Sequence, residues 1–434
     1  MTTNGFPAGF WWGSAASATQ TEGAAPRADY RRWEEQGRAP RSGDGNGFAT
    51  RYAEDFALLA EHGLTHHRLS LEWARLEPSE GVHDPEAVEH YRAVLEAARA
   101  AGLDVWACLH HFSLPGWFAD DLGGFTDDRA RGYHWARHVD WMGETFGDLV
   151  FGWKPINEPV AYAGGGWLLG TLPPGVSDFE AFTGALRGTL LANVEAWRLL
   201  RSGGKPVMSI MNLSPFYPAV RSREPDEREA AATAAQAFDD VFWTSWVRLV
   251  RDGVLALPGR AEEEVPDGRD AFDLIGFSYY FAQSVYADLS TGPYPADARV
   301  GPLGYAPWPE GLGIVLRRLA DELPRKPIVV AECGFGTPTA ADDDAWRTDL
   351  LRASLEETRD AVADGVDVRG FFHWTAVDNY EWSYGHDVAF GLFDRDRNPK
   401  GSAQLAKAWA LGADGATASP APTPATTPPK EHDR

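Results

Sequence analysis

Residues 153–159, Trp-Lys-Pro-Ile-Asn-Glu-Pro, end an apolar run of strand length on a carboxylate, Glu158. Residues 327–334, Pro-Ile-Val-Val-Ala-Glu-Cys-Gly, repeat this arrangement around Glu332. Short apolar runs with these boundaries are typical of strands that are buried on both faces. Both segments therefore predict a buried strand that carries a glutamate to the point where the strand meets a loop.

The same kind of run recurs along nearly the whole chain and alternates with amphipathic, helix-like segments. This alternation indicates βα units and a parallel sheet. The predicted strands are Phe10–Ala15, His66–Leu71, Asp104–His110, Val150–Ile156, Pro206–Asn212, Phe272–Ser278, Pro327–Ala331 and Val368–Trp374. The predicted helices are Ala49–His62, Pro85–Ala101, Asp128–Phe146, Phe179–Arg201, Glu227–Arg251, Gly311–Leu323, Ala345–Ala363 and Ser402–Ala410.

Eight strands and eight helices predict an α/β fold of one (β/α)8 TIM barrel over residues 1–412. A doubly wound sheet would need a glycine-rich phosphate loop after the first strand, and residues 12–17 do not form one. Residues 413–434 are rich in Ala, Thr and Pro and then charged, so we expect a disordered tail there.

The active site of such a barrel lies at the carboxyl ends of its strands. Amides, carboxylates, histidines and aromatic rings converge on that end in this sequence, and such groups bind sugar hydroxyls and sugar faces. The residues placed there are Gln20, Glu22, Arg68, Ser70, His110, His111, Asn157, Glu158, Asn212, Tyr279, Tyr280, Glu332, Trp374, Glu381 and Trp382. A carboxyl pair, one protonated and one ionised, is the minimum for cleaving a glycosidic bond. We therefore predict Glu158 as the general acid/base and Glu332 as the nucleophile.

At these positions the chain resembles the family 1 glycoside hydrolases, the retaining β-glucosidase family. The similarity covers residues 5–410 in order and includes an amino-terminal signature, a second-strand motif and a histidine loop. It also includes the acid/base motif, the nucleophile motif and the last strand with its sugar-binding loop. These segments are FPAGFWWGSAASATQTEG (6–23), HHRLSLEWARLEP (66–78), LHHFSLPGW (109–117), WKPINEP (153–159), AECG (331–334) and WTAVDNYEW (374–382).

The resemblance implies a role for each matching residue. It implies that four residues bind hydroxyls of the nonreducing sugar: Gln20, His111, Glu381 and Trp382. Asn157 would bind the 2-hydroxyl, Trp374 would lie under the ring, and Asn212 would line the pocket. Arg68 and Tyr280 would hold Glu332 ionised, since a nearby cation favours a carboxylate. Retention of configuration predicts two carboxyl groups about 5 Å apart.

The sequence departs from the family pattern at three positions near the carboxylates. Cys333 stands in place of asparagine and is expected to be a small buried filler. Ser278 also replaces an asparagine, and Pro155 replaces a threonine. Because proline has no N–H to give to a sheet, we expect a bulge or an unpaired position at Pro155.

The outer loops bear on the choice of substrate. Residues 383–391 contain no lysine or arginine, which disfavours a phosphosugar, and Tyr384 and His386 are candidates for the C6 end of the sugar or for solvated loop residues. An aromatic wall for the leaving group, or else core and rim positions, is predicted at Trp117, Trp167, Tyr217, Trp243 and Trp308.

The predicted activity is a retaining exo-β-glycosidase, in the first place a β-glucosidase acting on a small β-glycoside without metal or cofactor. Broader action on β-fucosides or β-galactosides, or transglycosylation onto a specialised aglycone, would use the same residues. A 6-phospho-β-glycosidase, an endo-acting polysaccharidase and a non-catalytic sugar-binding barrel are further alternatives.

Composition excludes several classes of partner. The formal net charge of −23 over 434 residues disfavours nucleic acid and anionic membranes. The two cysteines, Cys108 and Cys333, have no spacing of a metal site or disulfide framework, and no secretion signal is evident. We therefore expect a cytoplasmic protein, and the sequence does not define its oligomeric state.

Overall fold

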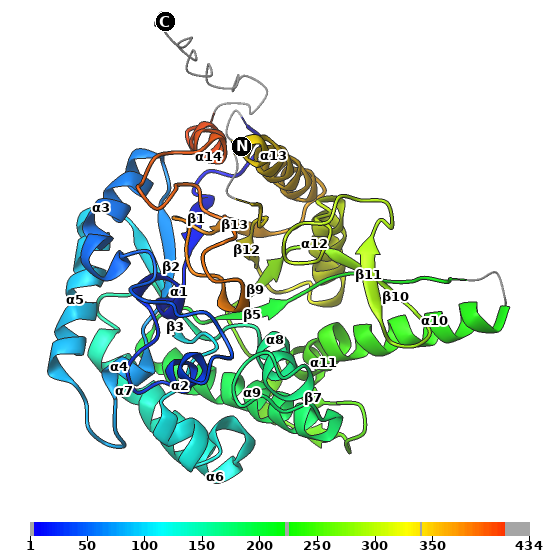
Figure 1. Ribbon diagram of the computed structural model, residues 1–434, viewed down its shortest axis with the longest axis horizontal. Coiled ribbons are helices and arrows are strands. Elements are labelled where there is room, and N and C mark those ends of the chain that lie inside the picture. Colours follow the sequence, from blue (N-terminus) through cyan, green and yellow to red (C-terminus); the bar gives the residue numbers. More distant parts are fainter. Residues whose placement is uncertain (1–3, 222–224, 339–340, 413–434) are drawn as a thin grey trace, which may run out of the picture.

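Eight parallel strands surround a common axis at the centre of the molecule (Figure 1). This computed structural model describes residues 4–221, 225–338 and 341–412. The strands pair in the order β4-β3-β2-β1-β13-β12-β9-β5. Parallel bridges from Trp153 to Val207 and from Asn157 to Ile210 join the first and last strands of this order. The sheet thus closes into the predicted barrel, whose strands are β1 (Trp11–Ala15), β2 (His66–Ser70), β3 (Asp104–His110), β4 (Gly152–Ile156), β5 (Met208–Asn212), β9 (Leu274–Tyr279), β12 (Ile328–Cys333) and β13 (Val368–Trp374).

A ring of helices covers the outside of the barrel (Figure 1). Local sequence sets where they begin: the Asp84 side chain caps α5, with Pro85 in the first turn, and Asp178 caps α9 through the N–H of Ala181 at 2.7 Å. The ring consists of α3 (Phe48–Glu61), α5 (Pro85–Ala100), α7 (Ala136–Phe146), α9 (Phe179–Leu200), α11 (Ser245–Asp252), α12 (Glu310–Glu322), α13 (Ala341–Ala363) and α14 (Gly401–Ala410).

Further elements occupy the connections. Their helices are α1 (Ala18–Glu22), α2 (Asp29–Glu35), α4 (Trp73–Leu76), α6 (Asp128–Ala130), α8 (Pro159–Ala163) and α10 (Pro225–Asp239), with single 3-10 or π turns at η1 (Trp117–Asp121), η2 (Gly124–Thr126), η4 (Gly164–Leu168), η5 (Arg201–Gly203), η7 (Pro266–Gly268) and η8 (Trp382–Tyr384). The sequence did not predict the two small sheets, which are formed by β6 (Phe216–Pro218), β10 (Ala282–Val285) and β11 (Thr291–Tyr294), and by β7 (Val254–Leu255) and β8 (Glu263–Glu264).

Two predicted helices are not continuous. The segment predicted over Asp128–Phe146 is divided by a π-helical turn, η3 (Arg131–Trp135), and the segment over Glu227–Arg251 by another, η6 (Asp240–Thr244). A π turn widens the backbone locally without ending the helix, so the apolar pattern on either side continues. The predicted tail at residues 413–434 lies outside the described residues.

The inside of the barrel is apolar at its lower end and polar at its mouth. Alternate residues of each strand point inward, and one inner layer is formed by Trp106, Met208, Ile210, Leu274, Val329, Ala331 and Phe372. Inward-facing positions nearer the carboxyl ends are occupied by charged and polar groups, among them Arg68 of β2 and Lys154 of β4, both fully buried.

A β-bulge in β12 determines where Glu332 points. Val330 pairs with Phe277 of β9, but Ser278 pairs with Glu332 rather than with Ala331. One extra residue on β12 allows Ala331 to pack in the inner layer while Glu332 faces the same interior. The predicted strand ended at Ala331, which was wrong by two residues, because β12 continues through Cys333.

A second bulge lies in β4 at the seam with β5. Three residues lie between Trp153 and Asn157, whereas two lie between their partners Val207 and Ile210. Pro155, which lacks an N–H, falls inside this mismatched stretch. The bulge expected at Pro155 is confirmed, and Glu158 follows directly after it.

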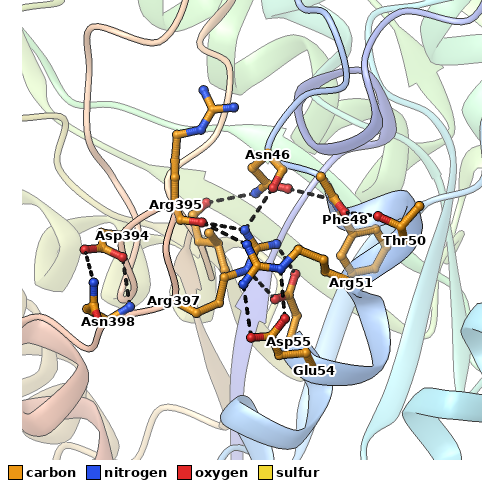
Figure 2. Close-up of polar contacts among 12 residues, drawn as sticks. Asn46, Phe48, Thr50, Arg51, Glu54, Asp55, Asp394, Arg395, Arg397 and Asn398 are labelled. Carbon is orange, nitrogen blue, oxygen red and sulfur yellow. Dashed lines mark hydrogen bonds and ion pairs between the residues drawn. The ribbon is translucent and has the colours of Figure 1, made fainter.

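The segment between β13 and α14 is tied to α3 by a buried ion pair (Figure 2). Arg397 donates to both carboxylate oxygens of Asp55, at 2.7 and 2.9 Å. It also donates to the carbonyl oxygens of Asn46 at 2.9 Å and of Arg395 at 2.7 Å. A single side chain therefore satisfies four acceptor oxygens on three residues, from two parts of the chain that lie far apart in sequence.

Candidate active site

Glu332 is held through both of its carboxylate oxygens. Arg68 forms an ion pair and hydrogen bond with Oε1, and the phenol of Tyr280 donates to Oε2 at 2.5 Å. Burial, together with the nearby charge of Glu158, raises the pKa of Tyr280 well above its ordinary value, so the phenol stays a donor. A buried guanidinium and a phenol together favour the ionised form of Glu332.

The second amino group of Arg68 reaches residues that directly follow β4 and β3. It donates to Oδ1 of Asn157 and lies 3.3 Å from Nδ1 of His111. The amide nitrogen of Asn157 lies 3.3 Å from Nε2 of the same imidazole. Burial, and after it the charge of Arg68, lowers the pKa of His111 well below its ordinary value. His111 is therefore neutral, and only one of its two nitrogens is an acceptor.

Glu158 stands immediately after β4 in a conformation that few residues adopt. Its φ is 45° and its ψ is 68°, the left-handed region that a non-glycine residue occupies only when its surroundings hold it there. Its side chain is almost fully buried. Burial raises the pKa of Glu158, while the Ser278 hydroxyl and the charge of Arg68 oppose that rise. The arrangement therefore stabilises the protonated form of Glu158.

Both glutamates face the same two groups. Arg68 and Tyr280 bond to Glu332 directly, and the charge of Glu158 acts on each of them. One carboxyl group in this centre is therefore paired with a cation, and the other is buried and has a raised pKa.

A second carboxylate cluster lies beside the pair. Gln20 uses its amide nitrogen to donate to Oε2 of Glu381 at 2.9 Å and to the carbonyl of Tyr380 at 2.8 Å. The hydroxyl of Ser17 donates to Oε1 of Gln20 at 2.7 Å. Burial, reinforced by the charge of Glu158, raises the pKa of Glu381 to about 8, although Gln20 lowers it. Sequence reasoning missed Ser17, although it lies within the amino-terminal signature.

Three flat rings line up at the mouth. The imidazole of His111 is stacked on Trp374, with centroids 5.7 Å apart and planes at 23°, and on Trp382 at 6.2 Å and 19°. Trp374 ends β13, and its carbonyl oxygen would lie 1.9 Å from a Cβ placed on Gly334. Glycine is therefore required directly after Glu332-Cys333 so that these two strand ends can approach.

The remaining predicted positions near the pair are also located. Asn212 ends β5, and its Oδ1 is buried without a hydrogen-bond partner among the described residues. The Ser278 hydroxyl likewise lacks a bond of good geometry. Cys333 points away from the carboxylates into the core between strands and helices, and burial raises its pKa to about 12. The expectation of a buried filler at Cys333 is confirmed.

The outer aromatic candidates divide into separate groups. Tyr217 stacks on Tyr294 at 4.0 Å, and Trp308 packs edge-on against the same ring at 4.8 Å, so these form one cluster. Trp243 is buried under Arg318 and belongs to the core. Trp167 packs against Tyr162 at 5.4 Å.

Three other loop candidates contact protein groups. The Trp117 indole donates to the carbonyl of Glu77 at 2.9 Å. Tyr384 donates to the carbonyl of Leu303 at 3.4 Å, and His386 packs on Tyr380 at 5.6 Å.

Within the part of the chain that the structure describes, no group of three or more His, Cys, Asp or Glu side chains has the arrangement of a metal site. The two cysteines there are free and buried. None of the described helices combines the length and the apolar character required to cross a membrane.

Comparisons with known proteins agree with this geometry. The family model described as glycosyl hydrolase family 1 matches residues 2–410. Beta-glucosidase A of Thermotoga maritima is 25% identical over 421 residues, covering 90% of this chain and 93% of its own. A cyanidin 3-O-glucoside 7-O-glucosyltransferase (acyl-glucose) of Delphinium grandiflorum is 26% identical, covering 91% and 86%. The solved beta-glycosidase from Pyrococcus horikoshii superimposes with a TM-score of 0.85 at 27% identity, covering 95% and 96%.

Proposed function

The chain belongs to glycosyl hydrolase family 1, and from this premise we propose that it is a retaining exo-β-glucosidase. It hydrolyses terminal nonreducing β-D-glucosyl residues by double displacement, with Glu332 as nucleophile and Glu158 as acid/base. The observation that carries the proposal is the unequal environment of the two glutamates. Glu332 is paired with Arg68 and Tyr280, whereas Glu158 is buried with a raised pKa.

In the first displacement, ionised Glu332 attacks the anomeric carbon of the bound glucoside. Glu158 gives its proton to the glycosidic oxygen as the C1–O bond breaks, and the aglycone leaves as an alcohol. The products are a glucosyl ester on Glu332 and an ionised Glu158. The donors from Arg68 and Tyr280 place the carboxylate in one orientation before substrate arrives.

In the second displacement, water replaces the aglycone. Esterified Glu332 carries no charge, so an ionised Glu158 no longer faces a negative carboxylate. Glu158 then takes a proton from water as the oxygen attacks C1 from the face that the aglycone left. The ester bond breaks, Glu332 returns to its ionised form, and glucose is released in the β configuration.

We assign the hydroxyl-binding roles to the groups around Glu381. Gln20 and Glu381 form a preassembled pair of donor and acceptor, and Trp374 offers a flat face close to Glu332. Asn157, already oriented by Arg68, is placed to bind the 2-hydroxyl. Every one of these side chains is at least nine-tenths buried. A terminal sugar enclosed by buried groups supports exo rather than endo cleavage.

Hydrolysis of a panel of 4-nitrophenyl glycosides tests the assignment. We expect turnover of the β-glucoside, with the β anomer seen first by NMR. Glu332→Gly should abolish turnover, and azide should restore it with an α-glucosyl azide as product. Glu80→Gly, at an exposed loop position, is the control for removal of a glutamate. Release of the α anomer, or turnover that survives Glu332→Gly, would disprove the mechanism.

Transglycosylation is a second candidate, because the glucosyl ester on Glu332 can be attacked by an alcohol in place of water. The similarity to an acyl-glucose-dependent glucosyltransferase supports this alternative. Adding an acceptor alcohol to the same assay separates the two, since a transglycosidase releases 4-nitrophenol without an equal amount of free glucose.

We also propose a cytoplasmic location. Cys108 and Cys333 are free, buried thiols, which is the usual state of cysteines in a reducing compartment. Fractionation of cells that express the full chain tests this location.

A further inference from the structure

Lys154 is a buried lysine at the centre of the barrel. It belongs to β4, has no exposed surface, and extends its Nζ to 5.0 Å from the ring of Phe372 on β13. The order of strands places β13 four strands away from β4, so the side chain crosses the barrel interior. Among the described residues Nζ has neither a hydrogen-bond partner nor a carboxylate.

Arg68, the cation paired with Glu332, has one unused donor in the same interior. Its two Nη groups reach Glu332 and Asn157, but its Nε–H is buried and has no partner within the described chain. Both fully buried side chains enter the barrel interior, Arg68 from β2 and Lys154 from β4, the two strands that flank β3. Within the described residues, each therefore has an unmet hydrogen-bonding requirement inside the barrel.

The charge state of Lys154 decides whether its nitrogen can accept a hydrogen bond. An ammonium carries three donors and no acceptor, and burying it unpaired is costly. Burial, and after it the charge of Arg68, lowers the pKa of Lys154 well below its ordinary value. The other titratable groups that interact with it are Cys108, His66, His67 and His111, and burial lowers the pKa of each of the three histidines.

We propose that Lys154 is a positioning residue for Arg68. Arg68 Nε–H donates to a bridging water of the kind that buried polar groups commonly share, and that water donates to the uncharged amine of Lys154. This contact holds Nε of the guanidinium, while Glu332 and Asn157 bind its two Nη groups. The proposal rests on the proposed function, because Arg68 is assigned to the nucleophile there.

Lysine-selective NMR tests the charge state directly. The full chain contains six lysines: Lys154, Lys205, Lys326, Lys400, Lys407 and Lys430. With ¹³Cε-labelled lysine, Lys154→Met identifies the signal of Lys154. We expect that signal to have the chemical shift of a neutral amine at pH 7, unlike the signals of the exposed lysines. A Lys154 signal that titrates near pH 10.5 would overturn the proposal.

Two variants of similar length test the acceptor. Lys154→Met keeps the apolar stem and removes the acceptor, whereas Lys154→Gln retains a carbonyl oxygen. We expect Lys154→Met to lower kcat/KM about tenfold and to move the acidic limb of its pH profile to higher pH, because a displaced Arg68 stabilises ionised Glu332 less. Lys154→Gln should keep the wild-type kcat/KM and the wild-type position of the acidic limb. Equal kcat/KM and pH profiles in the two variants would refute the acceptor role.

The thiol of Cys108 is the alternative hydrogen-bond partner for Arg68. Cys108 pairs with Lys154 across β3 and β4, and its thiol also stabilises the charge of Arg68. Cys108→Ala should therefore leave the acidic limb in place if Lys154 supplies the acceptor. A shift in Cys108→Ala without one in Lys154→Met would assign the contact to sulfur and overturn the proposal.

The outcomes separate this proposal from the proposed function. Retention and azide rescue are measured on the wild-type chain and on Glu332→Gly, and neither depends on Lys154. Failure of the lysine experiments alone leaves the nucleophile assignment intact. Melting temperatures of both lysine variants, matched within a few degrees, show that the kinetic differences do not come from unfolding.

Discussion

The phenol of Tyr280 donates to Oε2 of Glu332 at 2.5 Å, from a position just beyond the end of the neighbouring strand β9. Oε1 of the same carboxylate is taken by Arg68 on the far side of the barrel. With a separate donor for each oxygen, the carboxyl group cannot rotate without breaking a charge-assisted bond. The orientation of Glu332 is thus set by two strands that are remote from each other in sequence.

Removing the Tyr280 hydroxyl leaves one oxygen of Glu332 without its donor. A hydrogen bond to a charged group contributes about 1.5–3 kcal/mol, so Tyr280→Phe should lower kcat/KM by roughly 10- to 100-fold. Tyr133→Phe, at a ring that is 61% exposed, is the matched control and should behave as wild type. Steady-state kinetics on a β-glucoside check the prediction, and a loss below threefold would contradict it.

Ser278 acts on Glu158, the proposed acid/base, from the adjacent position of the barrel. Its hydroxyl lowers the pKa of Glu158, which burial raises. Ser278→Ala should therefore raise that pKa further, and Glu158 should stay protonated to higher pH. The basic limb of the kcat/KM profile moves upward as a result. The control is Ser284→Ala, whose hydroxyl bonds to Pro293 in a small sheet; a downward shift in Ser278→Ala would refute the assignment.

Glu381 should make the stability of the fold depend on pH. Its pKa is raised from 4.5 to about 8, chiefly by burial. Between these values the folded chain keeps a proton that the unfolded chain has lost, so the free energy of unfolding falls as pH rises. Glu381→Gln removes this contribution. We expect the melting temperature to fall less between about pH 5.5 and 8 in the variant than in wild type.

Some pH dependence should remain in Glu381→Gln. Burial also raises the pKa of Glu22 to about 7 and that of Asp29 to about 8. An unchanged or steeper loss of stability in Glu381→Gln would show that Glu381 is already ionised in the fold.

The Arg397–Asp55 pair should contribute to stability chiefly as a unit. Arg397→Met strands a buried carboxylate, and such a loss costs about 3–5 kcal/mol. Replacing both partners in Arg397→Met/Asp55→Leu should restore part of that free energy. Urea denaturation measures the difference. Arg51→Met, which breaks the exposed pair with Glu54 drawn in the same view (Figure 2), should cost about 1 kcal/mol or less.

A double variant no more stable than Arg397→Met would contradict this account. Such a result would mean that the carbonyl contacts of Arg397, rather than its charge pairing, hold the segment between β13 and α14.

Most of the barrel could be predicted because its strands are apolar on both faces and its helices are amphipathic. The position of Pro155 also predicted the bulge in β4, since proline has a definite effect on a ladder. The bulge in β12 has no such marker. Val-Val-Ala at residues 329–331 suits a regular strand and a bulged strand equally well, so the direction of Glu332 required the pairing partners to be known.

The sequence predicted which types of residue line the site, but it did not predict which of them contact one another. Gln20 and Glu381 are 361 positions apart, and only the closed barrel brings them within hydrogen-bonding distance. The π turns at residues 131–135 and 240–244 were missed because they preserve the apolar pattern of the helices around them. Tyr217 and Trp308 were predicted to form part of an aromatic wall for the leaving group, or else to be core or rim positions. Their shared partner Tyr294 lies on a small sheet that no local pattern indicated.

The extra residue in β12 also means that the strand can lose one codon without turning Glu332 away from the sugar pocket. Val330 packs in the core between strands and helices, and Glu332 already pairs with Ser278 of β9. Side chains alternate between the two faces of a strand, so deleting Ala331 would leave a regular strand in which Glu332 follows an outward-facing residue and still points inward. The inner layer would lose one methyl group, while Gln20, Glu381 and Trp374 would stay where they are. An in-frame insertion beside Ala331, rather than its deletion, is therefore the change of register that would turn the proposed nucleophile outward.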